Sequence, residues 1–550
     1  MSGLFRTKSI DALLAAAEDP ARRLRRTLGP WSLTALGIGA VIGSGIFILT
    51  GTAAAGETLS YDSLLHAPLL DILMHGTGAV ATLGRPGAGP AISLSFLLTA
   101  VACAFAALCY AELASMIPVA GSAYTYSYAT LGELFAWIIG WDLVLEYAVG
   151  SATVANGWSS YFQAVLKKAG WELPKYLQSA PIKFNHEAPW RDVSAWFEPT
   201  GAYINLPAVL VVLVITAVLV KGIRESATFN AVMVFIKTFA VVFVIVMGAF
   251  FVNPENWTRE FAPFGYGGFS FFGVPQLTIG QVIEGRPVGV LAGAAIIFFA
   301  YIGFDAVSTQ AEEAKNPGRD VPIGIIGSLV ICTLLYIGVV AVLTGMVPYD
   351  QIDKGAGVSS AFKTAAEAEG TSPLVRRILG TSELIINIAG VAGITSVLLV
   401  LMLSGPRVLL AMARDGLIPK GFFADVHPLF QTPWKSTIAV GCFVTILAGV
   451  LPIDALLELT NIGTLFAFAV VCAAVLVMRQ TNPQAHRPFR CPLVPVIPVM
   501  GILSCLMLMM SLPVGNWLRL IVWLLLGLSI YFAYGQHHSE LRKANQRLAN

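Results

Sequence analysis

The uncharged stretch LTALGIGAVIGSGIFILTG, residues 33–51, is apolar enough to cross a membrane but unusually rich in glycine. Each glycine destabilises a helix by about 0.8–1 kcal/mol relative to alanine. Gly39 and Gly43 form a GxxxG pair, which close packing between helices would explain. That packing does not require Gly45, so the sequence Gly43-Ser44-Gly45 predicts a local break in the helix. Backbone N–H groups freed beside a half-helix N-terminus suit a carboxylate ligand.

A second interrupted stretch, IIFFAYIGFDAVSTQAEEAKNPGRDVP, occupies residues 296–322. Gly303 ends an aromatic run, and Asp305 follows within the apolar part. A helix break here would expose carbonyl oxygens that suit an ammonium group; the alternative is a glycine packing contact, with Asp305 near the inner interface. Because the two interrupted spans lie five spans apart, they match the discontinuous helices of inverted-repeat transporters, whose site lies between them at mid-membrane.

The composition of the 550-residue chain excludes the soluble classes of protein. Apolar residues make up 56% of the chain and charged residues 12%, about half of the charged fraction of an average soluble protein. The mean hydropathy is +0.75 over the whole length, so the apolar residues do not belong to a single anchor. A net charge of +2 gives no case for a nucleic-acid partner. The chain is therefore predicted to be an all-α integral membrane protein.

Apolar runs long enough for membrane helices, which need about 20 residues each, occur throughout the chain. The twelve runs are residues 27–56, 86–111, 132–164, 199–220, 227–254, 287–304, 321–349, 384–406, 436–453, 459–478, 491–518 and 520–536. The distribution of lysine and arginine between the connecting segments predicts that both termini are cytoplasmic. We expect a cytoplasmic N-terminal segment (1–30), a first repeat of five helices (31–252), a second repeat (289–478), helices eleven and twelve (492–536) and a cytoplasmic tail (537–550).

Several motifs make the chain resemble the amino acid–polyamine–organocation (APC) superfamily and, within it, the bacterial form of the cationic amino acid transporter family. These motifs are LFRTKSIDALLA, LTALGIGAVIGSGIFILTG, YAELASMIPVAGSAYTYSYATLGELFAWIIGWDLVLEY, FFAYIGFDAVSTQAEEAKNP and PRVLLAMARDGLIP. The resemblance runs from about Leu4 to the C-terminus, although the 57–87 stretch is longer than the family pattern between the first two spans. It implies the leucine-transporter-type five-plus-five inverted repeat, with discontinuous helices 1 and 6 and two extra helices, and secondary transport of amino acids.

The resemblance also implies site residues by motif position. The candidate substrate-binding positions are Ile42, Ser44 and Gly45 for the carboxylate, the carbonyl groups of Phe299, Ala300 and Ile302 for the ammonium group, and Leu401 for the side chain. The proton-coupling groups of the family fall on Lys237 and Glu146.

The residues themselves allow two interpretations of these charges, which lie inside apolar runs. Lys237 lies about 9 Å from the inner edge of its span by helix rise, so it either snorkels to the interface or faces the bundle. In the bundle, desolvation favours the neutral amine, which would make Lys237 a proton carrier with Glu146 as its electrostatic or relay partner. Alternatively, backbone donors satisfy Glu146, which shares a helix face with Asp142. A fixed amine also removes the need for sodium or another metal.

These features predict an amino acid:proton symporter that imports its substrate by alternating access, in the bacterial inner (plasma) membrane; the alternative is an amino acid or amine exchanger on the same fold. An enzyme is disfavoured, because all seven histidines fall in loops or tails and no HExxH motif occurs. We expect an amino acid and protons as partners, and no cofactor. The family resemblance indicates cationic substrates. The apolar side chains of Val397 and Leu401, however, make small neutral amino acids an equally good expectation. Arg407, Arg414 and Asp415, which end the eighth run, indicate a cytoplasmic gate.

Overall fold

The computed structural model describes most of the chain. The described residues are 5–17, 24–43, 45–46, 50–55, 87–184, 197–258, 260–271, 278–283, 286–352, 357–367, 372–512 and 514–543. The predicted long connection at 57–87 therefore lies outside the described residues, except for Gly87.

The described chain is built mainly from helices. The α-helices are α1 (Ile10–Ala17), α2 (Pro30–Val41), α3 (Thr50–Ala55), α5 (Ile92–Met116), α6 (Ala123–Thr130), α7 (Glu133–Lys168), α8 (Leu206–Lys221), α9 (Ile223–Ala249), α10 (Glu255–Thr258), α11 (Val290–Ile297), α12 (Ala306–Thr309), α13 (Pro317–Met346), α14 (Gly357–Glu367), α15 (Pro373–Arg414), α16 (Lys420–Phe423), α17 (Trp434–Val450), α18 (Ile453–Thr481), α19 (Val496–Met510), α20 (Val514–Ile530) and α21 (Gln536–His538). Short 3-10 turns are η2 (Gly89–Ala91), η3 (Lys175–Leu177), η6 (Phe298–Tyr301), η7 (Ala311–Glu313) and η8 (Tyr349–Gln351), and η9 (Tyr531–Gly535) is a π-helical turn.

Three two-stranded antiparallel ribbons lie in the connections. They pair β1 (Ile182–Phe184) with β2 (Phe197–Pro199), β3 (Phe269–Ser270) with β4 (Thr278–Ile279), and β5 (Gln281–Ile283) with β6 (Arg286–Val288).

By length and composition, eight helical segments of the described chain could cross a membrane. They are Gly89–Met116, Glu133–Lys168, Thr228–Ala249, Val290–Thr309, Pro317–Met346, Leu379–Arg414, Ile462–Thr481 and Asn516–Lys543. Shorter apolar helices are Pro30–Val41, Leu206–Lys221, Trp434–Val450 and Val496–Met510. Each predicted apolar run overlaps one of these segments, so the helical membrane class is confirmed.

Local sequence explains where several of these helices begin. Pro30 and Pro317 stand in the first turns of α2 and α13, where the missing N–H would have had no helical partner. The side chain of Asn205 accepts a hydrogen bond from the N–H of Ala208 at 3.3 Å and caps α8. Proline and asparagine in the sequence therefore mark the starts of these three helices.

Packing encloses α2, which carries the first predicted break. Helix α2 packs against α13, α15 and α9, and α15 in turn packs against α7, α9, α17 and α8. From Leu33 onward nearly every side chain of α2 is buried, as expected for a helix surrounded by others. The broken segment therefore lies inside the bundle.

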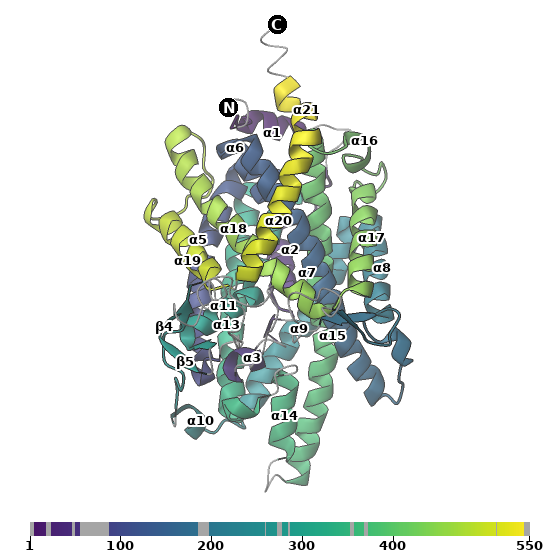
Figure 1. The fold of residues 1–550 in the computed structure, drawn as a ribbon, viewed down its shortest axis with the longest axis vertical. Helices are drawn as coiled ribbons and strands as arrows, with labels where there is room; N and C mark the ends of the chain where they lie inside the picture. Colours follow the sequence, from purple (N-terminus) through teal and green to yellow (C-terminus); the bar gives the residue numbers. More distant parts are fainter. Residues whose placement is uncertain are drawn as a thin grey trace.

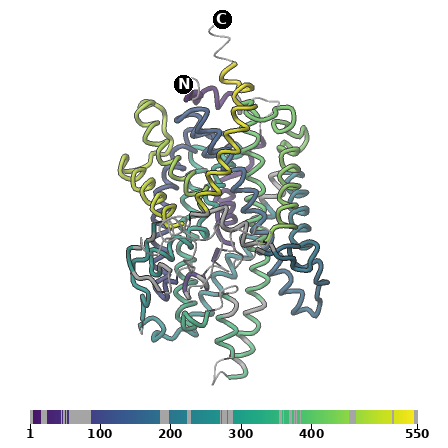
Figure 2. Tube along the Cα trace, in the orientation of Figure 1, coloured from purple at the N-terminus to yellow at the C-terminus, as the bar shows by residue number. Residues whose placement is uncertain are grey.

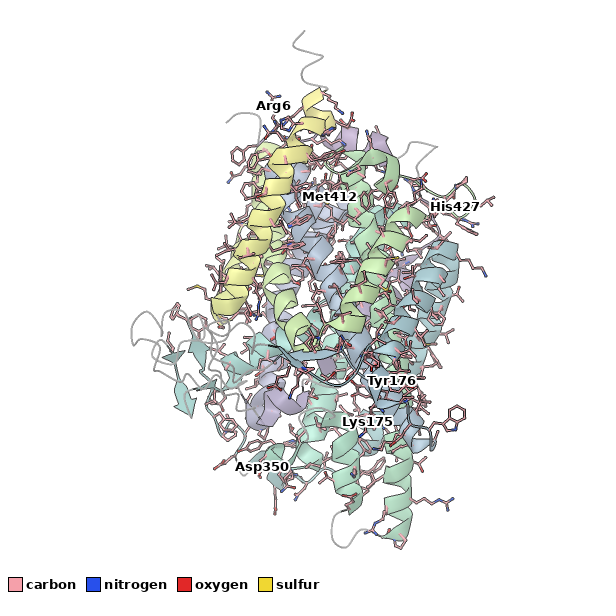
Figure 3. All side chains as sticks on the ribbon, turned by 45° about the vertical axis from the view of Figure 1, so that its right-hand side comes forward. Arg6, Lys175, Tyr176, Asp350, Met412 and His427 are labelled. Atoms are coloured by element: carbon pink, nitrogen blue, oxygen red, sulfur yellow. The ribbon has the colours of Figure 1, made fainter. Side chains whose placement is uncertain are left out.

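Both ends of the described chain lie at one end of the bundle, with α1, α6, α16 and α21 (Figures 1 and 2). We call this end the terminal face. Helices α10 and α14 and strands β4 and β5 lie toward the other end. In Figure 3 the side chain of Arg6 is at the terminal face, whereas Lys175, Tyr176 and Asp350 lie toward the opposite end.

Candidate functional site

The first predicted break begins slightly earlier than expected. Helix α2 ends at Val41, and Ile42 is extended with φ −74° and ψ 104°. Gly43 follows in a bend and Gly45 stands in a π-type turn, while Ser44 lies outside the described residues. The end of α2 therefore leaves carbonyl oxygens without partners in their own helix.

The second predicted break is centred on Gly303. After α11, the 3-10 turn η6 ends at Tyr301, and Ile302 is extended with ψ 134°. Gly303 has φ +118°, in the left-handed region that glycine adopts without steric strain. Asp305 follows and is fully buried, and α12 then begins at Ala306. Both interruptions expected from the glycine pattern are present.

The two breaks touch each other. A Cβ atom added to Gly45 would lie 2.5 Å from the Cα of Ala300. A Cβ atom added to Gly303 would lie 2.7 Å from the Cβ of Ala40. Distances below 3 Å mean that a larger residue at either glycine would force the backbones apart. Glycine is therefore needed at both positions for close approach.

Tyr336 of α13 joins the two breaks. Its hydroxyl lies 2.7 Å from the carbonyl oxygen of Val41 and 3.0 Å from that of Ala300. Its fully buried ring packs on Phe96 and Tyr301, with centroids 5.5 Å apart in each case. One side chain thus contacts a free carbonyl at each broken helix.

Lys237 of α9 holds the end of α2. Its Nζ donates to the carbonyl oxygens of Gly39 and Ile42, both at 2.7 Å, and to Ser396 Oγ at 2.5 Å. These three acceptors match the three protons of a lysine ammonium group. The residue is fully buried, so the alternative in which it snorkels to the interface is wrong.

Ser396 of α15 makes this arrangement tolerant of proton loss. Its hydroxyl also lies 2.8 Å from the carbonyl oxygen of Gly393 and 3.1 Å from that of Gly39. A serine hydroxyl can accept a hydrogen bond or rotate to donate one. A neutral Lys237 could still donate to both carbonyl oxygens and accept a hydrogen bond from the Ser396 hydroxyl, so either charge state can be fully hydrogen-bonded.

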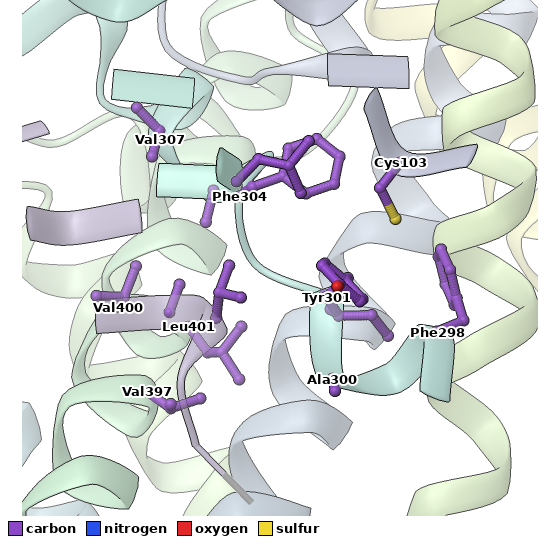
Figure 4. Packing of buried hydrophobic residues seen from close by; sticks show 14 of the residues in the cluster. Cys103, Phe298, Ala300, Tyr301, Phe304, Val307, Val397, Val400 and Leu401 are labelled. Carbon is purple, nitrogen blue, oxygen red and sulfur yellow. The ribbon is translucent and has the colours of Figure 1, made fainter. Parts of the chain in front are cut away.

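A small cavity lies between the breaks, α7 and α15. Its lining residues are Ala40, Val41, Gly43 and Gly45 from the first break, Phe299 and Ile302 from the second, Glu146, Gly150 and Val154 from α7, and Val397 and Leu401 from α15. Figure 4 shows Val397 and Leu401 on one side, with Ala300 and Tyr301 on the other. A mostly apolar wall with few polar groups is typical of small-molecule sites. We call it the central cavity.

The structure brings most, but not all, of the predicted substrate positions to this cavity. Gly45, Phe299, Ile302 and Leu401 line it. The two others that are described lie beside it and are held by neighbours: the carbonyl oxygen of Ile42 accepts from Lys237, and that of Ala300 accepts from Tyr336.

The two predicted coupling residues, Glu146 and Lys237, make separate sets of contacts. Glu146 lines the cavity, whereas the hydrogen bonds of Lys237 go to α2 and α15. Their pairing by a direct hydrogen bond is therefore not part of this structure.

Glu146 belongs to a group of buried acids. It is 3% exposed, Thr464 of α18 lies beside it, and neither carboxylate oxygen accepts a hydrogen bond from the described residues. Asp142, one turn earlier, is also buried with one unpartnered oxygen. Asp305 accepts a hydrogen bond from Tyr147 at 3.0 Å, and its other oxygen has no partner in the described chain. The predicted alternative, in which backbone donors satisfy Glu146, is not what these residues provide.

The candidate gate residues form ion pairs at the terminal face. Arg407 Nε lies 2.7 Å from Glu313 Oε1, and the guanidinium of Arg414 lies 2.8 and 3.0 Å from the oxygens of Glu312. All four side chains are nearly inaccessible to solvent. The pairs join α15 to η7, which follows the second break. Among the described residues, no group of three or more His, Cys, Asp and Glu is arranged to hold a metal ion.

The comparison with known families agrees with this architecture. The family model for amino acid permeases matches residues 28–531, which is nearly the whole chain. The chain belongs to the amino acid permease family. The resemblance to the APC superfamily is thereby confirmed.

The relatives of the permease are named transporters. It is 41% identical over 543 residues to the methylthioribose transporter of Bacillus subtilis (strain 168), covering 99% of this chain and all of the relative. It is 42% identical over 540 residues to the branched-chain amino acid permease BcaP of the same organism, and the match covers 98% of this chain and 99% of the relative. The vacuolar cationic amino acid transporter 4 of Arabidopsis thaliana is 29% identical over 662 residues, and the match covers 99% of this chain and 97% of the relative. The prediction that the chain is not an enzyme is confirmed.

Sequence reasoning missed the side chains that connect the breaks of the permease. Tyr336 and Ser396 stand in apolar runs where tyrosine and serine are ordinary, so nothing in their local sequence sets them apart. The sequence marks Asp305 as a charge inside an apolar stretch, but it does not indicate the contact of this residue with Tyr147. For the site as a whole, the signal in the sequence is the presence of two charged residues, Lys237 and Glu146, inside apolar runs on different helices.

Proposed function

We propose that the permease is a secondary active importer of amino acids that couples uptake to protons. In this proposal, twelve helices span the bacterial plasma membrane as a five-plus-five inverted repeat, residues 31–252 and 289–478, followed by two extra helices. The terminal face, with both termini, is cytoplasmic. Alternating access would open the central cavity to one side of the membrane at a time.

The observation that carries the proposal is the direct contact of two broken helices at a central cavity. A half-helix that begins after Gly43 would offer N–H groups to a carboxylate, and the carbonyl oxygens of the second break suit an ammonium group. An amino acid carries both groups at a fixed separation. The two breaks are in contact through Gly45 and Gly303, so one small zwitterion could engage both.

The support for proton coupling is the environment of Lys237. Its ammonium group donates to two carbonyl oxygens at the end of α2, and Ser396 can satisfy it in either charge state. Loss of its proton would weaken its hold on the carbonyl oxygens of Gly39 and Ile42. Protonation and the position of the first break are thereby linked. Glu146, with unpartnered oxygens in the cavity wall, is the proposed second proton site.

The substrate class proposed is a neutral amino acid with an apolar side chain. Val154, Val397 and Leu401 form an apolar part of the cavity wall, and one relative at 42% identity is named a branched-chain amino acid permease. One observation favours a second candidate: Glu146 gives the same cavity an acid that could bind a cationic side chain. Ligand competition separates these two candidates.

Binding by the purified protein tests the recognition part of the proposal. Free leucine should raise the midpoint of thermal unfolding, because a ligand stabilises by about 2.7 kcal/mol at a hundred times its Kd. Leucinamide, which lacks the carboxylate, should stabilise the protein far less. Lysine should also stabilise it less if the apolar cavity wall determines which side chain is accepted. Equal stabilisation by leucine and leucinamide would show that the first break does not bind a carboxylate. Methylthioribose serves as a third ligand, because one relative is named for it.

Transport in proteoliposomes tests the coupling. An inward proton gradient should drive accumulation into empty vesicles, and sodium should have no effect. Uptake that requires internal unlabelled amino acid, with or without the gradient, would instead identify the exchanger alternative.

A further inference from the structure

The C-terminal segment, which comprises η9, α21 and residues 539–543, packs on the terminal face next to the N-terminal segment 5–17 (Figures 1 and 2). Both segments contact the start of α7 and the end of α15. Their contacts converge on two acids, Glu133 and Asp415, which are themselves buried. We propose that the C-terminal segment is a latch that completes the docking site of the N-terminal segment and so controls when the terminal face can open.

The first acid, Glu133, receives the C-terminal segment through its side chain. Its carboxylate accepts hydrogen bonds from Tyr531 at 2.8 Å and from Ser539, and the Arg542 guanidinium lies 3.4 Å away. Tyr128 of α6 donates to it as well, at 3.0 Å. Glu133 and Ser539 are fully buried. The carboxylate therefore ties three residues of the C-terminal segment to the start of α7.

The same place on α7 receives the N-terminal segment through the backbone. The N–H of Glu133 donates to the carbonyl oxygen of Arg6 at 3.1 Å, and the N–H of Lys8 donates to that of Tyr128 at 3.1 Å. Gly132 lies directly under Phe5, with a hypothetical Cβ only 2.5 Å from the Phe5 carbonyl carbon. Moving Glu133 or Tyr128 would therefore disturb both segments.

The second acid, Asp415, repeats this pattern at the end of α15. Its carboxylate accepts from Lys8 Nζ at 2.6 Å and from the Tyr124 hydroxyl at 2.7 Å. Its backbone carbonyl oxygen accepts from the N–H of Glu540 at 3.0 Å. Gly416 is left-handed, with φ +77°, and a Cβ there would lie 2.5 Å from the carbonyl oxygen of His538. The C-terminal segment thus fixes the backbone of the residue that binds Lys8.

The two segments contact these acids in complementary ways. The N-terminal segment bonds to the backbone of Glu133 and the side chain of Asp415, whereas the C-terminal segment bonds to the side chain of Glu133 and the backbone of Asp415. Neither segment competes with the other for an atom. Docking of one should therefore stabilise docking of the other, which is positive coupling between two local folding events.

Release of the N-terminal segment matters because it continues into α2 and the first break. The N–H groups of Thr27 and Leu28 donate to the carbonyl oxygen of Glu313 at 3.0 and 3.1 Å, beside the Arg407 ion pair. These contacts join the residues just before α2 to η7 at the terminal face. Opening it requires α2 and η7 to separate from α15, which Lys8 opposes while it is bound to Asp415.

Hydrogen–deuterium exchange of the purified full chain tests the latch without any transport assay. Ser539→Val removes one hydrogen bond to Glu133, and deletion of residues 539–550 removes the rest of the segment beyond α21. Exchange in peptides from residues 5–17 should be about tenfold faster in Ser539→Val, the effect expected for losing a hydrogen bond to a charged group. The deletion should have a larger effect. Exchange in α14, toward the opposite end, should not change.

Lys543→Met is the matched control, because the substitution keeps the backbone hydrogen bond from Lys543 to Ser539 and removes a side chain whose ion pair in the described chain is the solvent-exposed one with Glu540 at 3.6 Å. It should leave exchange in residues 5–17 at the wild-type rate. Faster exchange of residues 5–17 in Ser539→Val, together with a wild-type rate in Lys543→Met, supports the latch. Wild-type exchange of residues 5–17 in both Ser539→Val and the deletion variant would overturn it, even if the transport function proposed above is correct. If the deletion variant fails to fold, Ser539→Val decides.

Discussion

Buried charges are compensated in different ways at the terminal face and in the middle of the bundle. At the terminal face, Glu112 accepts from the guanidinium groups of Arg479, at 2.9 and 2.7 Å, and Arg487, at 3.2 Å, and from a backbone N–H at 2.7 Å. In the middle, Lys237 has only carbonyl groups and a hydroxyl as partners, and the oxygens of Glu146 have none among the described residues.

The difference separates structural charges from those that can change during a transport cycle. An ion pair is neutral as a unit, and removing one partner leaves a buried charge uncompensated. A charge that is held by dipoles, or left unpaired, has a more adjustable protonation state because no opposite charge fixes it. We therefore expect substitutions at the terminal face to change mainly stability, and substitutions in the middle to change mainly transport.

The largest effect is expected at Lys237. Lys237→Met should reduce accumulation driven by a pH gradient to the level of protein-free vesicles. The substitution removes the proton carrier and leaves the carbonyl oxygen of Ile42 without the donor seen here. Lys221→Met is the control, because Lys221 is exposed at the end of α8, and it should transport normally. Wild-type accumulation by Lys237→Met would assign the coupling to another group.

A smaller effect, on stability, distinguishes two glutamates. Glu112→Gln should destabilise the fold by about 3–5 kcal/mol, because it leaves buried arginine charge without its partner. Glu146→Gln should leave the midpoint of thermal unfolding unchanged or raise it, because a charge without hydrogen-bond partners is removed from a buried site. The same Glu146→Gln protein should lose proton-driven accumulation.

Thermal unfolding in detergent, followed by uptake in proteoliposomes, provides both measurements. Equal destabilisation by Glu112→Gln and Glu146→Gln would contradict the distinction between the two regions. It would mean that Glu146 has a structural partner of its own.

The smallest effect is expected at the cavity wall. Leu401 is 5% exposed and lines the central cavity, so Leu401→Ser should widen the accepted substrates toward longer or cationic amino acids. A change of this size in an apolar pocket shifts discrimination by about 1–3 kcal/mol. Competition by a panel of amino acids against labelled substrate gives the ranking. Leu334→Ser, at a 67% exposed position of α13, should keep the wild-type order. An unaltered ranking in an active Leu401→Ser protein would make Leu401 a packing residue only.

Much of the fold followed from apolar run lengths, because a helix that crosses a bilayer must satisfy its backbone within itself. Each of the predicted runs overlaps an apolar helix, and both glycine-marked breaks are present. The break at Gly303 could be predicted because its left-handed φ suits glycine. Its counterpart was predicted one residue late, since the extended residue is Ile42 and isoleucine does not itself mark a helix end.

The sequence by itself determined the membrane class, the helix positions and the residue types available at the breaks, all of which depend on local hydrophobicity and backbone preference. It did not determine the partner of each buried charge. Lys237 bonds to carbonyl groups 198 and 195 residues away, and Glu112 to an arginine 367 residues away. Such contacts depend on which helices pack together and in which rotation, and these are set by the whole bundle. Only the tertiary structure therefore decided that Lys237 holds the first break, while the carboxylate of Glu146 lines the cavity with no hydrogen-bond partner among the described residues.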